Sequence, residues 1–179
     1  MSVTLVAGVT GVGLTSVCQA VRGKLDGDYK LLNFGDIMLE QAATSGITTD
    51  RSELATLTQT QTRRLQRRAG EFVADAAAES DVILSTHLAV ETDVGYIQGL
   101  PDEVLQDVSP TAFILVEADP ETILSRRGES QDSERKVAFE QQLNRSAALQ
   151  YAREQSVPVQ FLENEGSIED AAERMATNL

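Results

Sequence analysis

A glycine-rich turn near the start of the chain constrains the fold more than any other feature of the sequence. Ser2–Ala7 is a short, apolar and β-branched run typical of a buried strand, and the apolar spacing over Thr15–Leu25 predicts a helix. Gly8–Ser16 joins the two and contains three glycines. Glycine adopts positive φ and lets successive backbone N–H groups surround a phosphate. The sequence therefore predicts a phosphate-binding turn, and the alternative is a glycine-rich turn that binds nothing.

The spacing within this turn matches the phosphate-binding pattern G-x-x-x-x-G-K-[ST], with Leu14 in place of the lysine. The helix that follows directs the positive end of its dipole at the same place. Because the lysine neutralises charge on the phosphoryl group being transferred, leucine disfavours efficient transfer. The hydroxyl of Thr15 suits Mg²⁺, so Thr15 is the predicted metal ligand. The residues predicted to bind a nucleotide are Gly8, Val9, Thr10, Gly11, Val12, Gly13, Leu14, Thr15 and Ser16.

Strand and helix patterns alternate along the rest of the chain. A break is predicted near Thr58 in the helical segment Arg51–Glu79, and Asp119-Pro120 is a helix start. The alternation predicts an α/β protein, and together with the phosphate-binding turn it favours the three-layer P-loop NTPase fold, as a single domain over residues 1–179. It has a five-stranded parallel sheet with helices on both faces, and ligands of such sheets bind beyond the carboxyl ends of the strands. The later strands are predicted at Tyr29–Phe34, Asp81–Thr86, Thr111–Glu117 and Val157–Leu162, and the later helices at Asp36–Ala43, Val137–Glu154 and Ser167–Thr177.

Charge and composition narrow the functional classes. The chain has 28 acidic and 15 basic residues and a net charge of −13, so its surface repels nucleic acids. Few lysines among many acids favour adaptation to high salt over an ordinary acidic enzyme. No apolar run approaches the roughly 20 residues of a membrane-spanning helix, and a single cysteine, Cys18, excludes an internal disulfide. We expect a cytoplasmic protein that binds neither nucleic acid nor membranes.

Several motifs beyond the turn resemble those of the archaeal-type adenylate kinases, a branch of the P-loop nucleoside monophosphate kinases. The most distinctive is GYIQGLP at Gly95–Pro101, because this family carries a closely similar G-Y-L-P-G-L-P. The resemblance extends over most of the chain, through NFGDIM at 33–38, Asp50-Arg51, TQTR at 60–63, Ala69-Gly70, Thr86-His87, EADP at 117–120, ILSRR at 123–127 and NRSAA at 144–148.

The resemblance implies an adenylate kinase that transfers a phosphoryl group reversibly from ATP to AMP, with Mg²⁺, and thereby maintains adenine nucleotide balance. Family members are usually trimers, so a homotrimer is expected. Two departures count against full activity: Leu14, and Ser85 at a position where the family has an aspartate. A shortened lid is a third. The alternatives are a nucleotide-binding paralogue that has lost most of its activity, and a nucleoside monophosphate kinase of another base specificity.

The resemblance also implies an insert that binds the nucleoside monophosphate, at about residues 35–80, and a short lid, at about 127–144. A guanidinium fork suits phosphate oxygens, so Arg51 is predicted to bind the AMP phosphate, and the alternative is a surface arginine paired with Asp50 or Glu53. The predicted AMP-binding residues are Gly35, Asp36, Arg51, His87, Gly95 and Tyr96, and the predicted catalytic lid residues are Arg126, Arg127 and Arg145.

Some of these residues have an alternative reading of equal or greater weight. His87 is the only histidine, and a structural hydrogen bond is as well supported as contact with substrate. The segment Gly95–Pro101 is favoured to contact the nucleobase or the acceptor, and the alternative is a glycine-rich surface turn. Four arginines of one helical segment are predicted to form a solvated face or a subunit contact rather than to contact substrate directly. They are Arg63, Arg64, Arg67 and Arg68.

Overall fold

The computed structural model describes residues 1–25, 27–128, 131–177 and 179, and its centre is a parallel sheet. The five strands lie in the order β2-β3-β1-β6-β7, and every neighbouring pair is parallel, which confirms the predicted sheet. The strand Asp81–Thr86 was predicted with the bounds that it has. The strands are β1 (Val3–Ala7), β2 (Tyr29–Asn33), β3 (Asp81–Thr86), β6 (Ala112–Glu117) and β7 (Val159–Glu163).

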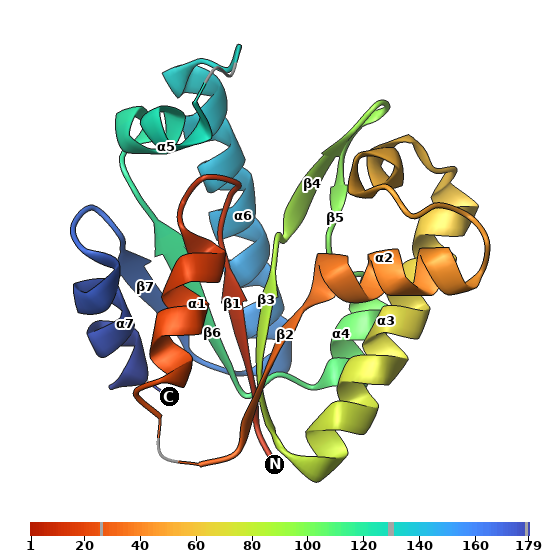
Figure 1. Cartoon of the computed structure of the whole chain (residues 1–179), viewed down its shortest axis with the longest axis horizontal. Coiled ribbons are helices and arrows are strands. Elements are labelled where there is room, and N and C mark those ends of the chain that lie inside the picture. Colours follow the sequence, from red (N-terminus) through yellow and green to blue (C-terminus); the bar gives the residue numbers. More distant parts are fainter. Residues whose placement is uncertain (26, 129–130, 178) are drawn as a thin grey trace.

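Helices cover both faces of this sheet, as predicted (Figure 1). Alternate residues of β1 point to opposite sides, so that Leu5 belongs to one hydrophobic core and Val6 to the other. The Leu5 core is closed by α2, α3, α4 and α6, and the Val6 core by α1, α5 and α7. The helices are α1 (Leu14–Arg22), α2 (Phe34–Thr44), the 3₁₀ helix η1 (Arg51–Thr56), α3 (Gln59–Glu79), α4 (Asp102–Val108), α5 (Pro120–Arg127), α6 (Glu134–Gln155) and α7 (Ile168–Ala176).

Side-chain caps define several helix starts at predicted positions. Thr58 and Gln61 form a reciprocal capping box that separates η1 from α3, which confirms the break predicted there. The side chain of Ser167 accepts a hydrogen bond from the backbone of Asp170 and so begins α7. Pro120 is the first residue of α5, where its missing N–H costs nothing.

The sequence prediction missed one hairpin and one helix, and it began another helix too late. The hairpin consists of β4 (Ala89–Thr92) and β5 (Gly95–Gln98), which pair antiparallel, and α4 follows it. Helix α6 begins at Glu134 rather than Val137, because Ser133 caps it and its first turn is polar. Residues 134–144 of the predicted lid are therefore helical, and its residues 129 and 130 lie outside the described part of the chain.

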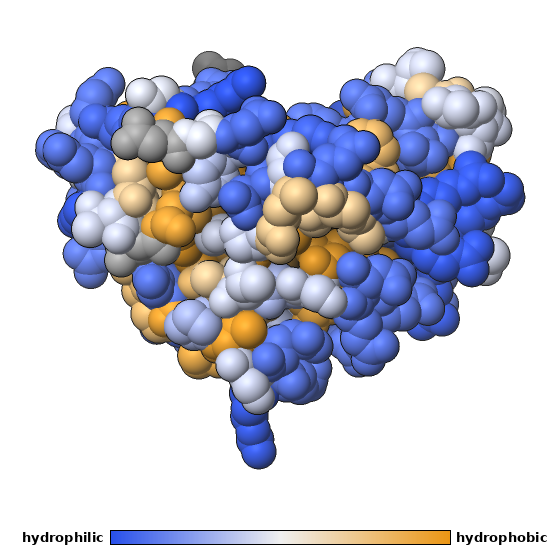
Figure 2. Space-filling view, turned by 90° about the horizontal axis from the view of Figure 1, so that it is seen from below, coloured by the Kyte–Doolittle hydropathy of each residue, from blue (hydrophilic) through white to orange (hydrophobic). Residues whose placement is uncertain are grey.

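The face of the molecule that is seen from below is mainly hydrophilic, with apolar residues gathered near its middle and on one side (Figure 2). The termini lie toward this end of the molecule in Figure 1, away from the turn between β1 and α1. No helix among the described residues is long and apolar enough to cross a membrane.

Candidate nucleotide-binding site

A cleft of about 720 Å³ lies beyond the carboxyl ends of the strands, where the sheet topology predicts a ligand. The turn after β1 forms one wall of it. The rest comes from the end of β2, from the 3₁₀ helix η1, from α5 and from residues that follow β3 and β7. Its predicted site residues come from four separate parts of the sequence. The lining residues are Val9, Thr10, Gly11, Gly13, Leu14, Thr15, Ser16, Asn33, Arg51, His87, Arg126, Asn164, Gly166, Ser167 and Ile168.

Two side chains stabilise the turn after β1 by donating hydrogen bonds to one of its carbonyl oxygens. Asn164 Nδ2 donates to the carbonyl oxygen of Val12 at 2.8 Å, and Arg126 Nη1 donates to the same atom at 3.2 Å. Gly13 caps α1 with φ 89° and ψ 19°, in the left-handed region that glycine tolerates best. A Cβ at Gly13 would lie 2.6 Å from Asn164 Nδ2. Only glycine therefore fits this turn without a shift of Asn164.

Leucine at the position of the usual lysine is a core residue that reaches the cleft only at its edge. Leu14 is 7% exposed and packs in the core beneath α1 and α7. Thr15 and Ser16 are exposed on the first turn of α1, and both line the cleft. The turn therefore offers backbone N–H groups and hydroxyls to a ligand, and no ammonium group.

The three predicted catalytic arginines occupy different environments. Arg126 lines the cleft, and its Nη2 donates to the main-chain carbonyl of Asn164 at 2.9 Å. Arg127 is nearly buried and donates through Nε to the carbonyl of Thr10 at 2.8 Å. Arg145 lines neither this cleft nor the smaller cavity beside it, and it pairs with Glu117 at 2.6 and 3.0 Å.

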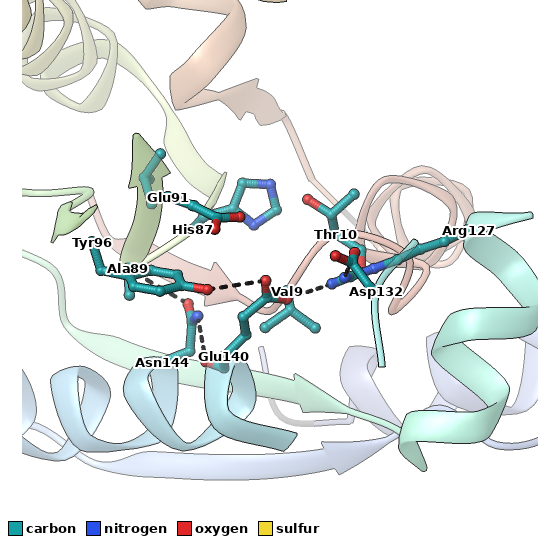
Figure 3. Close-up of a pocket in the computed structure, with 11 residues that line it drawn as sticks. Val9, Thr10, His87, Ala89, Glu91, Tyr96, Arg127, Asp132, Glu140 and Asn144 are labelled. Atoms are coloured by element: carbon teal, nitrogen blue, oxygen red, sulfur yellow. Dashed lines mark hydrogen bonds and ion pairs between the residues drawn. The ribbon is translucent and has the colours of Figure 1, made fainter. Parts of the chain in front are cut away.

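A second cavity of about 290 Å³ adjoins the cleft and contains a cluster of charges (Figure 3). Arg127 bonds Asp132 and Glu140, each at 2.7 Å, with its side chain 9% exposed. Burial acts to lower the pKa of Arg127, but the hydrogen bonds and charges of these two carboxylates outweigh it and raise the pKa. Lys136 bonds Glu91 and Asp132, each at 2.9 Å, and these contacts raise its pKa. Both bases are thus firmly cationic.

On the opposite side of the cleft, three of the predicted AMP residues, Gly35, Asp36 and Arg51, lie close together. Arg51 forms an ion pair with Asp36, and not with Asp50 or Glu53 as the alternative reading held. A Cβ at Gly35 would lie 3.2 Å from Arg51 Nη1, so glycine leaves room for the guanidinium. Asn33 caps α2 by accepting a hydrogen bond from the backbone of Asp36 at 3.0 Å. The cap fixes the carboxylate that holds Arg51.

Ser85, two residues before the histidine, does not face the cleft. It is 3% exposed, and its hydroxyl donates to the carbonyl of Leu32 at 3.2 Å. Asn33 Nδ2 in turn donates to the Ser85 hydroxyl at 3.1 Å. Ser85 is therefore a structural residue that joins β2 to β3, and it offers nothing to a metal ion.

His87 lies between the cleft and the smaller cavity and lines both. Its Nδ1 donates to the Gly8 carbonyl at 2.5 Å, since a carbonyl oxygen can only accept. Burial is the main cause that lowers the pKa of His87; the bond to Gly8 opposes it, and the charges of Arg51 and Arg127 lower the pKa further. These contacts together favour the neutral imidazole over the imidazolium.

The hairpin positions the last two predicted AMP residues away from Arg51. Gly95 and Tyr96 begin β5, and Tyr96 lines the smaller cavity, where its hydroxyl donates to Glu140 at 3.3 Å (Figure 3). Gly95 is exposed and lines neither cavity. The structure thus brings Gly35, Asp36, Arg51 and His87 toward one site and separates Gly95 from it.

Sequence reasoning missed two residues that shape the cleft. Asn164 is 1% exposed and 152 residues distant in sequence from the Val12 carbonyl that it binds. Asn33 ends β2 and caps α2, and its place near the end of a predicted strand was the available signal. Asn164 has a signal of the same kind, because it follows the last predicted strand.

Comparisons with known proteins agree with this geometry. A family model described as an AAA domain matches residues 7–144. The chain is 34% identical to an adenylate kinase of Methanothermobacter thermautotrophicus, with all of both chains covered. It is 36% identical to one of Methanopyrus kandleri, which covers 90% of this chain and 88% of that one. A sugar kinase structure from Janibacter sp. HTCC2649 shares the fold, with a TM-score of 0.56 at 19% identity over 99% of this chain and 93% of that one.

Proposed function

The chain belongs to the adenylate kinase family, and we propose that it transfers a phosphoryl group reversibly from ATP to AMP, giving two ADP. The observation that carries this proposal is the cleft itself, which joins a phosphate-binding turn to Arg51 on its other side. A nucleotide-binding protein with a single ligand needs only the turn. Two phosphate-binding groups across one cleft support a donor and an acceptor.

In this proposal the work of the protein is positioning and charge neutralisation. The backbone N–H groups of Gly8–Ser16 hold the phosphates of ATP, and Arg126 lies beside them. Arg51 holds the phosphate of AMP. An oxygen of that phosphate attacks the terminal phosphorus of ATP while the bond to the bridging oxygen breaks. A role for Arg145 stays a prediction, because it lines neither cavity.

Mg²⁺ is the cofactor that the family implies, and Thr15 is the side chain that suits it. Its hydroxyl is exposed in the cleft at the first turn of α1. None of the described residues that line the cleft is an aspartate or glutamate, and the described chain holds no cluster of metal-binding side chains. Bound Mg²⁺ would neutralise phosphate charge, with phosphates and water as its other ligands. We therefore assign only Thr15 to the metal.

A second candidate function, a nucleotide-binding protein with little turnover, is favoured by Leu14 and Ser85. The former is buried and the latter is bonded to the main chain, so neither supplies the charge or metal contact expected of an efficient kinase. The two functions differ in one measurable property. Both bind ATP and AMP, but only the kinase converts them to ADP.

A coupled assay of ADP formation from ATP and AMP in molar KCl tests the proposal, with Arg51→Ala as the variant. Loss of a guanidinium–phosphate contact should raise the KM for AMP by about 10- to 100-fold, and that for ATP much less. Arg64→Ala is the matched control, because Arg64 is also an exposed arginine of the insert but does not line the cleft. Equal rises in both KM values would place Arg51 elsewhere, and binding without turnover would favour the second candidate.

A further inference from the structure

We propose that His87 is a catalytic residue whose Nε2 takes up a proton when both nucleotides bind. Its Nε2–H then donates to a phosphate oxygen. This inference rests on the proposed function, since it needs phosphates from a donor and an acceptor near one imidazole. The proton comes from water and returns to it when the products leave, and no bond forms between the ring and phosphorus.

The hydrogen bond to the main chain fixes which ring nitrogen faces the ligand. Nδ1 donates to the Gly8 carbonyl, so it keeps its hydrogen in both charge states. Within the described chain, the structure gives Nε2 no hydrogen-bond partner. Neutral Nε2 is an acceptor, as phosphate oxygens are, so the two cannot bond until Nε2 gains a proton. Figure 3 shows the ring opposite the hydrogen-bonded pair Tyr96 and Glu140.

The place of His87 puts it near both halves of the reaction. It follows β3, the strand beside β1, and its Nδ1 is bonded to the first residue of the phosphate-binding turn. Arg51 lines the cleft on one side of it, and Arg127 lines the smaller cavity on the other. The turn, Arg51 and His87 thus line one cleft, in which a phosphoryl group would pass between donor and acceptor.

The charges around the ring explain why binding should change its protonation. The charges of Arg51 in η1 and Arg127 in α5 lower the pKa of the imidazole, and the charge of Glu140 in α6 raises it. Glu91 of β4 and Asp132 also line the smaller cavity. Burial and the two arginines hold the pKa of His87 below its usual value. Phosphates neutralise those arginines and add negative charge, which favours the imidazolium. A cation here also offsets the charge that Leu14 does not supply.

The first test needs no variant, because the chain has one histidine. Protein without added histidines is titrated from pH 5 to 9 by ¹H–¹³C NMR of the imidazole, alone and with diadenosine pentaphosphate, which spans both nucleotide sites. We expect the pKa of His87 to rise by about 1 to 3 pH units on binding, the effect of a nearby opposite charge. An unchanged pKa with clear shifts of the Gly8–Ser16 amide signals would overturn the inference and leave the function standing.

The second test counts protons with a variant that keeps the bond to Gly8. In His87→Asn, the side-chain amide can still donate to that carbonyl, but it cannot take up a proton. Calorimetry of diadenosine pentaphosphate binding in buffers of different ionisation enthalpy should show more proton uptake by wild type than by the variant near pH 7. The kcat of the variant should fall about 10²-fold, as for the loss of one donor to developing charge.

The outcomes separate the two proposals. Equal proton uptake by wild type and His87→Asn would assign the protons to the nucleotide and end the case for His87. A ratio of wild-type to His87→Asn kcat that stays constant from pH 6 to 8 would also count against His87, because a titrating donor must change the pH profile. If the analogue shifts no amide signal at all, the proposed function fails and this inference with it.

Discussion

Replacing Gly13 by alanine tests the geometry of the phosphate-binding turn with the smallest possible side chain. The left-handed conformation of Gly13 costs a residue with a Cβ about 1–2 kcal/mol. The added Cβ would also lie 2.6 Å from Asn164 Nδ2. Asn164 cannot easily move aside, because its main-chain N–H donates to Glu117 and its carbonyl accepts from Arg126. Alanine therefore forces either the asparagine or the turn to shift.

The chain offers a matched control for the backbone part of this cost. Gly46 has φ +68°, and a Cβ there would meet nothing within 4 Å. Gly46→Ala should lower the free energy of unfolding by about 1 kcal/mol, from backbone strain alone. Gly13→Ala should lower it by about 2–5 kcal/mol, since overpacking against a buried side chain adds roughly 1–3 kcal/mol. Each kcal/mol corresponds to about 2–4 °C in Tm for a chain of this length.

Urea unfolding of both variants in molar KCl measures the difference, and KM values show its effect on the site. Gly13→Ala should raise the KM for ATP more than that for AMP, and Gly46→Ala should change neither. In an Asn164→Ala background the clashing atom is absent, so the cost of Gly13→Ala should fall to about that of Gly46→Ala. If Gly13→Ala costs no more than Gly46→Ala in the native background, the reasoning about Asn164 is wrong.

Two further predictions concern the thiol and the charge. Burial raises the pKa of Cys18 to about 12. A thiol reagent at pH 8 should therefore modify the native protein only as fast as the protein unfolds. Rapid modification of the folded protein would contradict the buried position of Cys18. With a net charge of −13, raising KCl from 0.01 to 1 M shortens the Debye length from about 30 to about 3 Å and should raise the Tm and favour any oligomer. Circular dichroism and light scattering across a KCl series measure both, and a protein equally stable at both ends would remove the high-salt interpretation.

Much of the fold could be predicted because its signals are local. The strand Asp81–Thr86 is mostly apolar, as expected of a strand covered on both faces. The break at Thr58 is a capping box, whose two side chains are three residues apart. The start of α6 could not be found in the same way, because Glu134 and its neighbours are polar and only Ser133 marks the boundary. The hairpin strands are four residues each, too short for a clear period.

The sequence could predict which residues lie at the candidate site where a motif contains them, but it could not predict the partners that tertiary structure gives them. The turn Gly8–Ser16 and Arg51 both line one cleft, as their patterns indicated. That Ser85 bonds the main chain of Leu32 depends on the pairing of β2 with β3, which no local pattern specifies. The ion pair of Arg51 likewise depends on η1 lying against the start of α2. Spacing predicted that these residues matter, and packing determined their partners.

The bond between Asn164 and the Val12 carbonyl has a consequence for biosynthesis. The two residues are 152 positions apart, and Thr10 is 117 positions from the Arg127 that binds its carbonyl. Translation proceeds from the N-terminus at roughly 5–20 residues per second, so the turn leaves the ribosome many seconds before its last donor. A nascent chain that ends before Asn164 holds the motif without the clamp that shapes it. The shape of the turn is therefore completed only after Asn164 has been made, 152 residues later than the carbonyl that it binds.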